Sequence, residues 1–236
     1  MTQDRRTWIK SPITIGLTGG SGAGKTTLTR NLINHFGADQ VSYIPHDAYY
    51  CDLGHLSPEE RRQVNFDHPD ALDTALYIKH IMALQNGEAI DKPTYDFVAH
   101  TRTEKTEQVE PRPIIIVEGI LIFADLRLRD LMDLRVFIDI ASDVRFIRRL
   151  LRDTTERGRA TESVIARWLE NVRPSHLEFI APNRRFADVI IPEEVKHIAT
   201  DLMVAYLEKF LKPDAQRASR SKKPLELIPD TGSGEL

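Results

Sequence analysis

One glycine-rich segment limits what this chain can fold into more than any other feature. Residues 19–27, GGSGAGKTT, match the pattern G-x-x-x-x-G-K-[S/T] at every fixed position. The segment follows the apolar run ITIGLT (13–18) and overlaps the start of a stretch with helical periodicity (25–36). Glycines let the backbone N–H groups of such a loop turn toward a phosphate, an approach that larger side chains would block. The sequence therefore predicts a phosphate-binding loop between a strand and a helix.

The remaining apolar runs indicate the rest of the architecture. Runs with the length of buried parallel strands lie at 41–45, 114–123, 136–140 and 188–192. Helical patterns lie between them, and alternating strands and helices are typical of a parallel sheet covered on both faces. The sequence therefore predicts an α/β fold of the P-loop NTPase type.

Several helix ends carry local signals. Gly37 is expected to end the helix that follows the glycine-rich segment, and SPEE at 57–60 has the form of a capping box. Asp70 is expected to cap the next long helix, with Asp73 in its first turn. A final amphipathic helix is expected over residues 198–211.

Composition limits the kinds of binding partner and the cellular compartment that we expect for this protein. The 32 basic and 35 acidic residues give a net charge of −3, so no global field attracts nucleic acid or an anionic membrane. The single cysteine, Cys51, excludes an internal disulfide framework. No apolar run approaches the roughly 20 residues that cross a bilayer. We therefore expect a cytoplasmic protein with one domain over 11–212, flanked by flexible tails at 1–10 and 213–236.

The glycine-rich pattern assigns first roles to its residues. Lys25 is expected to reach the β- and γ-phosphates of a nucleoside triphosphate, and Thr26 is expected to bind Mg²⁺. A second metal ligand should come from the end of a neighbouring strand, where Glu118 is favoured and Asp139 is the alternative. The loop residues expected to hold the phosphates are Gly19, Gly20, Ser21, Gly22, Ala23, Gly24, Lys25, Thr26 and Thr27.

Another carboxylate follows the second predicted strand. Asp47, in HDAYY (46–50), should lie at the same sheet edge as the glycine-rich loop. It could accept the proton of a hydroxyl that attacks the γ-phosphate, or it could cap a turn. These residues alone leave both roles open, and they suit a GTPase, a motor or a small-molecule kinase equally well.

Four further segments resemble those of a known protein family and so distinguish among these three classes of protein. They are NFDHPDALD (65–73), PTYDFVAHTR (93–102), RRLLRDTTERGR (148–159) and FADVIIP (186–192). Together with the segments above, from about Ile13 to Pro192, they resemble the uridine-cytidine kinase family within the phosphoribulokinase and uridine kinase group of P-loop proteins. The resemblance implies a Mg²⁺-dependent enzyme that moves the γ-phosphate of ATP to the 5′-hydroxyl of uridine or cytidine. It also implies a small β/loop insertion that binds the nucleoside, and a homo-oligomer, often a tetramer.

The resemblance further implies an acceptor site. Asp47 matches the general base for the nucleoside 5′-hydroxyl, and Asp67 matches the aspartate that holds the ribose hydroxyls. Aromatic faces would hold the flat pyrimidine, and a histidine would hydrogen-bond its edge. The implied pocket residues are Tyr50, Phe66, Tyr95, Phe97 and His100. Without the resemblance, the phenylalanines and Tyr95 would be assigned to an ordinary core.

An arginine-rich stretch, RFIRRLLRDTTERGR (145–159), holds six arginines and two acids. By itself it could form a solvated amphipathic helix that packs Phe146, Leu150 and Leu151 inward. It could equally form a lid whose arginines neutralise a transferring phosphoryl group.

The resemblance favours the lid, with Gly158 as a hinge. It implies that Arg149 and Arg159 contact the acceptor, and that Arg152 and Arg157 act catalytically on the triphosphate. The two arginines of this stretch without a match, Arg145 and Arg148, are assigned to a solvated face.

Two departures from the family pattern bear on specificity. Arg167 stands where the family usually carries a glutamine that helps to hold the acceptor, and a guanidinium has donors only. EEVKH (193–197) stands where the family usually carries a basic residue, glycines and an asparagine near the donor's adenine. Base preference and GTP as an alternative donor therefore stay open. Two alternative functions also stay open. One is a related P-loop kinase that acts on another hydroxyl-bearing molecule, and the other is a nucleotide-binding regulator without catalysis.

Overall fold

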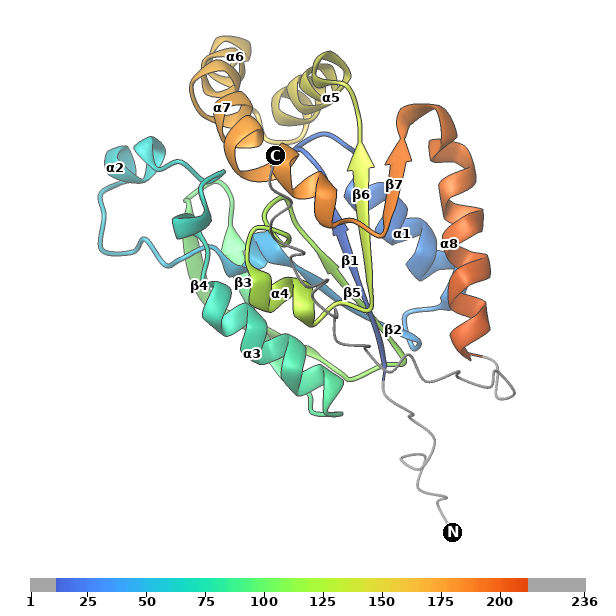
Figure 1. Ribbon diagram of the computed structural model, residues 1–236. Helices are drawn as coiled ribbons and strands as arrows, with labels where there is room; N and C mark the ends of the chain where they lie inside the picture. Colours follow the sequence, from blue (N-terminus) through green and yellow to red (C-terminus); the bar gives the residue numbers. More distant parts are fainter. Residues whose placement is uncertain (1–11, 212–236) are drawn as a thin grey trace, which may run out of the picture.

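The structure is a computed structural model, and it describes residues 12–211 without the side chains of residues 196 and 197. Its centre is a parallel sheet in the order β2-β5-β1-β6-β7 (Figure 1). The five strands are β1 (Ile13–Thr18), β2 (Val41–Pro45), β5 (Ile114–Glu118), β6 (Leu134–Asp139) and β7 (Val189–Pro192). The predicted α/β fold is confirmed. The predicted tails at 1–10 and 213–236 lie outside the described residues.

Helices cover both faces of this sheet (Figure 1). α1 (Lys25–Phe36) and α8 (Lys196–Leu211) pack on one face. α3 (Thr74–Gln85) and α4 (Leu126–Asp130) pack on the other. Two hydrophobic clusters, one under each helical layer, therefore hold the sheet between them.

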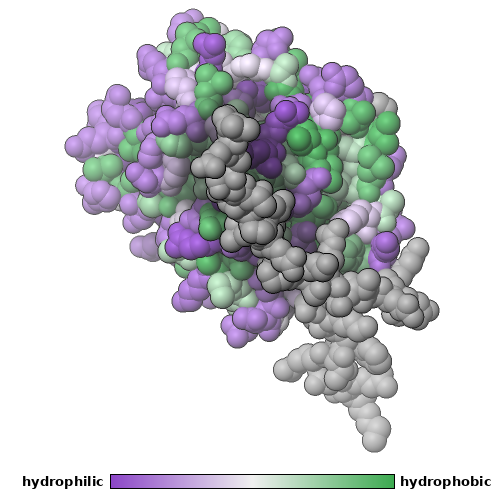
Figure 2. All heavy atoms as spheres, viewed as in Figure 1, coloured by the Kyte–Doolittle hydropathy of each residue, from purple (hydrophilic) through white to green (hydrophobic). Residues whose placement is uncertain are grey.

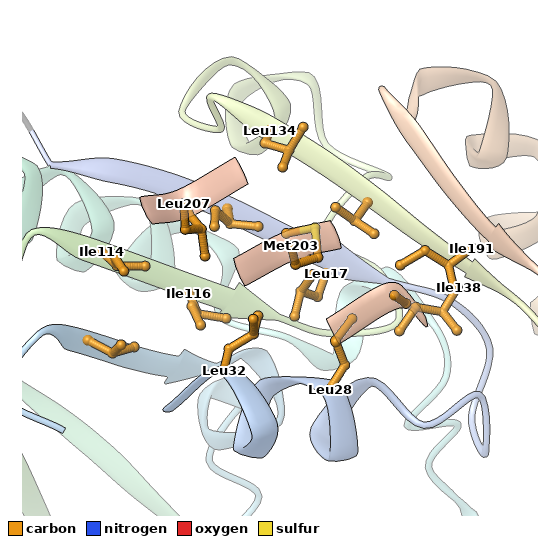
Figure 3. Packing of buried hydrophobic residues seen from close by; sticks show 14 of the residues in the cluster. Leu17, Leu28, Leu32, Ile114, Ile116, Leu134, Ile138, Ile191, Met203 and Leu207 are labelled. Atoms are coloured by element: carbon orange, nitrogen blue, oxygen red, sulfur yellow. The ribbon is translucent and has the colours of Figure 1, made fainter. Parts of the chain in front are cut away.

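The strand β5 shows why these segments are continuously apolar. Ile114 and Ile116 lie in the cluster that contains Leu28 of α1 and Met203 of α8 (Figure 3). The intervening Ile115 lies in the cluster beneath α3. Because successive side chains of a strand point to opposite faces, a strand covered on both faces needs apolar residues at every position.

Two further parts complete the molecule. β3 (Ile90–Asp96) and β4 (Thr101–Val109) form a separate antiparallel sheet, which is the predicted insertion. α5 (Ser142–Thr155) and α6 (Thr161–Arg167) lie beyond the carboxyl ends of the strands (Figure 1). From Arg167 the chain stays helical through α7 (Arg173–Ser175) to Ile180. The arginine-rich stretch is thus helical up to Thr155, while Arg157, Gly158 and Arg159 follow the helix as a loop.

Helix ends set by neighbouring residues lie where the sequence predicts them. α1 has the predicted bounds, and the Gly37 N–H bonds the Ile33 carbonyl at 2.8 Å. The capping box precedes α2 (Pro58–Gln63): Ser57 Oγ accepts the Glu60 N–H at 3.3 Å, and Glu60 Oε2 accepts the Ser57 N–H at 2.8 Å.

The start of α3 differs from the prediction. Asp73, rather than Asp70, is the N-cap, and its Oδ1 accepts the backbone N–H of Leu76 at 3.1 Å. The preceding residue, Leu72, has extended backbone angles and pairs with Tyr50 as an isolated β-bridge. Because this bridge holds the chain extended, the helix begins later than the local signal at Asp70 suggests.

The predicted strand over 114–123 is also shorter than expected, since β5 ends at Glu118. The Gly119 N–H donates to the Leu17 carbonyl at 3.2 Å, and turns follow. Ile122 and Phe123 are still buried, in the cluster beneath α3. Their apolar character therefore serves packing of a turn and does not extend the strand.

The surface is uneven in hydropathy. In the view of Figure 2, hydrophilic residues dominate around α2 and α3. Apolar residues are more frequent toward β7 and α8, where Val189, Ile190 and Leu202 are exposed. Within residues 12–211, no helix has the length and apolar character needed to cross a membrane.

Candidate active site

The glycine-rich loop joins β1 to α1 at the carboxyl edge of the sheet. Lys25, at the start of α1, is 7% exposed, and its Nζ donates to the carbonyls of Gly19 (3.0 Å) and Gly20 (3.3 Å). Burial lowers the pKa of Lys25, and the carboxylates of Glu118 and Asp47 oppose that shift. The loop and the two carboxylates therefore surround one buried amine, as a site for phosphate and metal requires.

Glu118 lies beside the hydroxyl predicted to bind Mg²⁺. Thr26 Oγ1 donates to Glu118 Oε1 at 2.9 Å, and Tyr43 donates to Oε2 at 2.7 Å. The alternative ligand, Asp139, is instead paired with Arg184 at 3.0 Å. A hydroxyl and a carboxylate oxygen at the loop are hard donors of the kind that Mg²⁺ prefers. The residues present fit the metal, and the contacts favour Glu118 over Asp139.

Arg145 packs directly against the loop. A Cβ on Gly20 would overlap its guanidinium, and a Cβ on Gly22 would overlap its carbonyl. Arg145 is only 3% exposed, and its guanidinium carbon lies 5.5 Å from the centroid of the Trp168 ring. The assignment of Arg145 to a solvated face is therefore wrong, because its charge is enclosed by the loop and by a helix distant in sequence.

Other residues of α5 also depart from a simple amphipathic pattern. Phe146 packs against Trp168 with ring centroids 5.3 Å apart, whereas Leu151 is 59% exposed, so the expectation that Leu151 packs inward is wrong. Arg148 is half-buried and pairs with Glu193 at 2.8 Å. This ion pair ties α5 to the segment EEVKH that departs from the family pattern.

The predicted base lies in the turn after β2. Asp47 belongs to a 3-10 turn, His46–Tyr49, and its side chain is exposed on the wall of a cleft. Its neighbour His46 is buried, and burial lowers the pKa of His46 to about 3. The turn therefore presents a carboxylate to solvent while burying a neutral imidazole behind it.

The cleft brings together residues from segments far apart in the sequence. Its wall includes Asp47, Ser21 of the glycine-rich loop, and the two arginines predicted to act on the triphosphate, Arg152 and Arg157. It also includes every residue predicted for the acceptor site, which are Tyr50, Phe66, Asp67, Tyr95, Phe97, His100, Arg149, Arg159 and Arg167. One cavity thus contains the predicted base, the predicted acceptor residues and the edge of the predicted phosphate loop.

Aromatic rings form one side of this cleft. Phe66 and His100 stack with centroids 4.9 Å apart and planes at 17°, and Tyr50 meets Phe66 edge-on at 5.2 Å. Burial, and then the charge of nearby Arg159, lowers the pKa of His100 to about 4, so the ring is neutral near pH 7. The Tyr95 hydroxyl is buried without a hydrogen-bond partner among the described residues. Flat apolar faces with unpaired polar edges suit a planar heterocycle.

Two arginines of the cleft wall connect neighbouring segments by polar contacts. Arg149 donates to Ser21 Oγ at 2.8 Å, which connects α5 to the phosphate loop. Arg167 donates to the Arg62 carbonyl at 2.7 Å, which connects α6 to the end of α2. Asp67 is 8% exposed; burial raises its pKa, and the charge of Arg149 opposes this shift.

Four residues of the cleft wall are absent from the sequence predictions. They are Val64, Ile120, Asn171 and Val172. Asn171 lies four positions after Arg167 in a continuous helical run, so helical spacing could have indicated it. The others carry no chemical signal of their own, because an apolar residue on a pocket wall looks the same in sequence as one in the core.

Comparison with known proteins identifies the family. The family model described as Phosphoribulokinase / Uridine kinase family matches residues 14–199. The chain belongs to this family. Two curated relatives, each named uridine kinase, come from Listeria monocytogenes serotype 4a (strain HCC23) and Chloroflexus aurantiacus (strain ATCC 29366 / DSM 635 / J-10-fl). The Listeria protein is 52% identical over 204 residues, which cover 86% of this chain and 98% of the relative. The Chloroflexus protein is 51% identical over 202 residues, which cover 85% of this chain and 97% of the relative.

Solved structures agree at the level of the fold. Phosphoribulokinase from Rhodobacter spheroides aligns with a TM-score of 0.57 at 17% identity, over 78% of this chain and 70% of that one. D-glycerate 3-kinase from Cryptococcus neoformans aligns with a TM-score of 0.53 at 16% identity, over 73% of this chain and 80% of that one. At such identities the likeness concerns the fold alone, and it shows that the sheet and helices are arranged as in these two proteins.

Proposed function

We propose that this member of the phosphoribulokinase and uridine kinase family is a uridine kinase. It transfers the γ-phosphate of ATP to the 5′-hydroxyl of uridine or cytidine and yields the nucleoside monophosphate. The observation that carries the proposal is the single cleft lined by Asp47, the predicted acceptor residues and Ser21 of the phosphate loop. The names of relatives with 52% and 51% identity support the same activity.

The chain's own residues supply binding and proton transfer. Phe66, Tyr95 and Phe97 hold the pyrimidine between ring faces. His100 hydrogen-bonds the edge of the base, and Asp67 accepts hydrogen bonds from the ribose hydroxyls. Held in this way, the 5′-hydroxyl faces the donor and Asp47 takes up its proton as it attacks. The exposed position of Asp47 on the cleft wall supports this role over that of a turn cap.

The donor half of the site neutralises phosphate charge. Backbone N–H groups of residues 19–27 and the amine of Lys25 hold the phosphates of ATP. Thr26 and Glu118 would hold Mg²⁺, which when bound neutralises charge on the phosphates. Arg152 and Arg157 close over the transferring group and exclude water. We further propose a cytoplasmic homo-oligomer, with ATP preferred to GTP.

A coupled ADP-release assay tests this function directly. Purified protein with Mg²⁺ and ATP is given uridine, cytidine or no acceptor, and the product is identified by mass. We expect ADP release that depends on the nucleoside, together with UMP or CMP. ADP release that ignores both nucleosides, or none at all, would contradict the proposal.

One observation supports a second candidate. Arg167 adds a cation to the cleft wall where the family usually has a neutral glutamine, and it would favour an acceptor that carries a negative charge. A substrate panel with ribulose 5-phosphate and pantothenate separates the two functions. Turnover of either, with no turnover of uridine or cytidine, would identify a related P-loop kinase with another acceptor.

A further inference from the structure

A buried carboxylate lies near the end of the arginine-rich helix, and the reaction outlined above gives it no role. Asp153, in the last turn of α5, is 1% exposed. It does not line the cleft, so it is not a group that meets the substrates. A buried carboxylate is costly unless its charge is compensated, which makes its surroundings informative.

Four arginines converge on this carboxylate. Arg152 Nη2 lies 2.8 Å from Oδ1 and its Nε donates to the same oxygen at 2.9 Å, while Arg157 Nη1 lies 3.5 Å from Oδ1. Arg159 Nη1 donates to Oδ2 at 3.1 Å, and Arg149 Nε lies 3.6 Å from Oδ2. All four arginines line the cleft that Asp153 itself does not reach.

The two oxygens divide the arginines by their predicted partners. Oδ1 contacts Arg152 and Arg157, the pair predicted to act on the triphosphate. Oδ2 contacts Arg149 and Arg159, the pair predicted to contact the acceptor. The Arg159 N–H also bonds the Asp153 carbonyl at 3.0 Å, which folds the chain after Gly158 back onto the helix.

The charges explain why this arrangement needs Asp153. Four guanidinium groups on one cleft wall repel each other, and only an opposite charge behind them can hold them together before an anionic substrate arrives. Burial by itself would raise the pKa of Asp153, but the charges of Arg152, Arg149 and Arg157 and the hydrogen bond from Arg152 together lower it. The carboxylate therefore stays ionised at neutral pH.

We propose that Asp153 is the positioning residue of the lid. Its Oδ1 fixes the two arginines predicted to act on the triphosphate, and its Oδ2 fixes the two predicted to contact the acceptor, so that both pairs keep their places on the cleft wall. This inference rests on the proposed kinase function, because it gives the arginines their substrates. It assigns no contact with substrate to Asp153, which acts only through the four side chains in front of it.

The test compares Asp153→Asn with a matched control on the same helix, Asp143→Asn. Asp143 is exposed in the first turn of α5, so the control makes the same chemical change away from the arginines. For Asp153→Asn we expect kcat to fall at least tenfold and KM for uridine to rise at least threefold. KM for ATP should not rise, because losing one negative charge leaves the cleft more cationic. The control should stay within twofold of wild type in all three constants.

A second readout is independent of turnover. Arginine Nε–H resonances in ¹⁵N-edited NMR spectra report ordered guanidinium groups. We expect several dispersed signals of the free wild-type protein to collapse toward the random-coil position in Asp153→Asn but not in Asp143→Asn. This distinguishes the two proposals: if wild type has no kinase activity but the signals behave as expected, the proposed function fails while the positioning role of Asp153 stands.

Asp153→Glu covers the case in which the Asn variant does not fold. It keeps the charge but displaces it by one methylene, so kcat should fall at least threefold although the ion pairs persist. Wild-type kcat in Asp153→Glu would overturn the proposal, because charge without position would then suffice. Two results for Asp153→Asn would also overturn the proposal. The folded variant could match Asp143→Asn in kinetics and spectrum, or it could lose thermal stability with no change in either.

Discussion

At the scale of single residues, three carboxylates of the candidate site differ in their exposure to solvent. Asp47 is exposed in its turn, whereas Asp67 and Glu118 are almost completely buried. A proton acceptor has to meet the reacting hydroxyl, while a carboxylate that binds a metal or ribose gains from a dry, fixed position. The different exposures thus agree with the different roles proposed for these three carboxylates.

The role of Asp47 can be tested by removing its basicity without changing its shape. In Asp47→Asn we expect kcat to fall by about 10² to 10⁴, the usual contribution of general acid–base catalysis. KM for uridine should change less than about threefold, because the side chain does not hold the base or the ribose. Steady-state kinetics with uridine measure both constants. Asp201→Asn, at an exposed position of α8, is the control, and equal activity of the two variants would remove Asp47 from the reaction.

The choice between Glu118 and Asp139 as metal ligand can be tested by titrating Mg²⁺. Glu118→Gln should raise the Mg²⁺ concentration for half-maximal activity at least about tenfold, the usual effect of disturbing a ligand set. Asp139→Asn should leave it unchanged, because Asp139 is paired with Arg184 away from Thr26. The opposite result would move the metal ligand to β6.

At the scale of secondary-structure elements, long-range pairing overrides a local helix signal. Asp70 and Asp73 are both acceptable N-caps by residue type. Only Asp73 caps α3, because the β-bridge to Tyr50 keeps Leu72 extended and separates the 3-10 turn that contains Asp70 from the helix. The bridge residue Tyr50 directly follows the turn His46–Tyr49, so the pairing connects the start of α3 to the turn that carries Asp47.

The corrected cap predicts different costs for two similar substitutions. Asp73→Ala should destabilise the protein by about 1–2 kcal/mol, since it removes the cap and a partner of Arg102. Asp70→Ala should stay within about 0.5 kcal/mol of wild type, because the Asp70 side chain is 91% exposed. Urea unfolding of both variants measures the free energy of unfolding. Equal costs would indicate that Asp70 caps the helix after all.

At the scale of the whole molecule, buried histidines link stability to pH. His46 is buried against Tyr77, with ring centroids 4.4 Å apart, and burial lowers the pKa of His46 from 6.5 to about 3. The pKa values of His100 and His176 are lowered to about 4, so they act in the same direction. Between these values and 6.5 the unfolded chain binds more protons than the folded protein, so the free energy of unfolding falls as pH falls.

His46→Gln isolates one part of this dependence. Between about pH 6 and pH 5, one such histidine contributes at most roughly 1.4 kcal/mol of lost stability per pH unit. The variant should therefore lose less stability than wild type over this range, whatever its stability at pH 7. The free energy of unfolding from urea titrations at each pH provides the measurement, with His55→Gln at an exposed position as control. A slope unchanged by His46→Gln but altered by His55→Gln would contradict the assignment.

The sequence by itself determined those features that depend on neighbouring residues or on continuous burial. The glycine-rich loop, the bounds of α1 and the capping box before α2 all arise from contacts within a few positions. The parallel strands follow from continuous apolar runs, because a sheet covered on both faces needs no polar side. The residues proposed to bind the acceptor could be predicted only from the resemblance to a family, since aromatic residues of a pocket and of a core look alike in sequence.

The tertiary structure alone decided the burial of those side chains whose energy depends on contacts between parts of the fold. Arg145 is buried because the glycines of the loop leave room for its guanidinium, and Leu151 is exposed although its helix is amphipathic. Arg159 joins the other arginines around the buried Asp153 because the chain after Gly158 folds back onto α5. A sequence pattern records the polarity of a side chain, but the cost of burying its charge depends on partners that only the folded chain brings together.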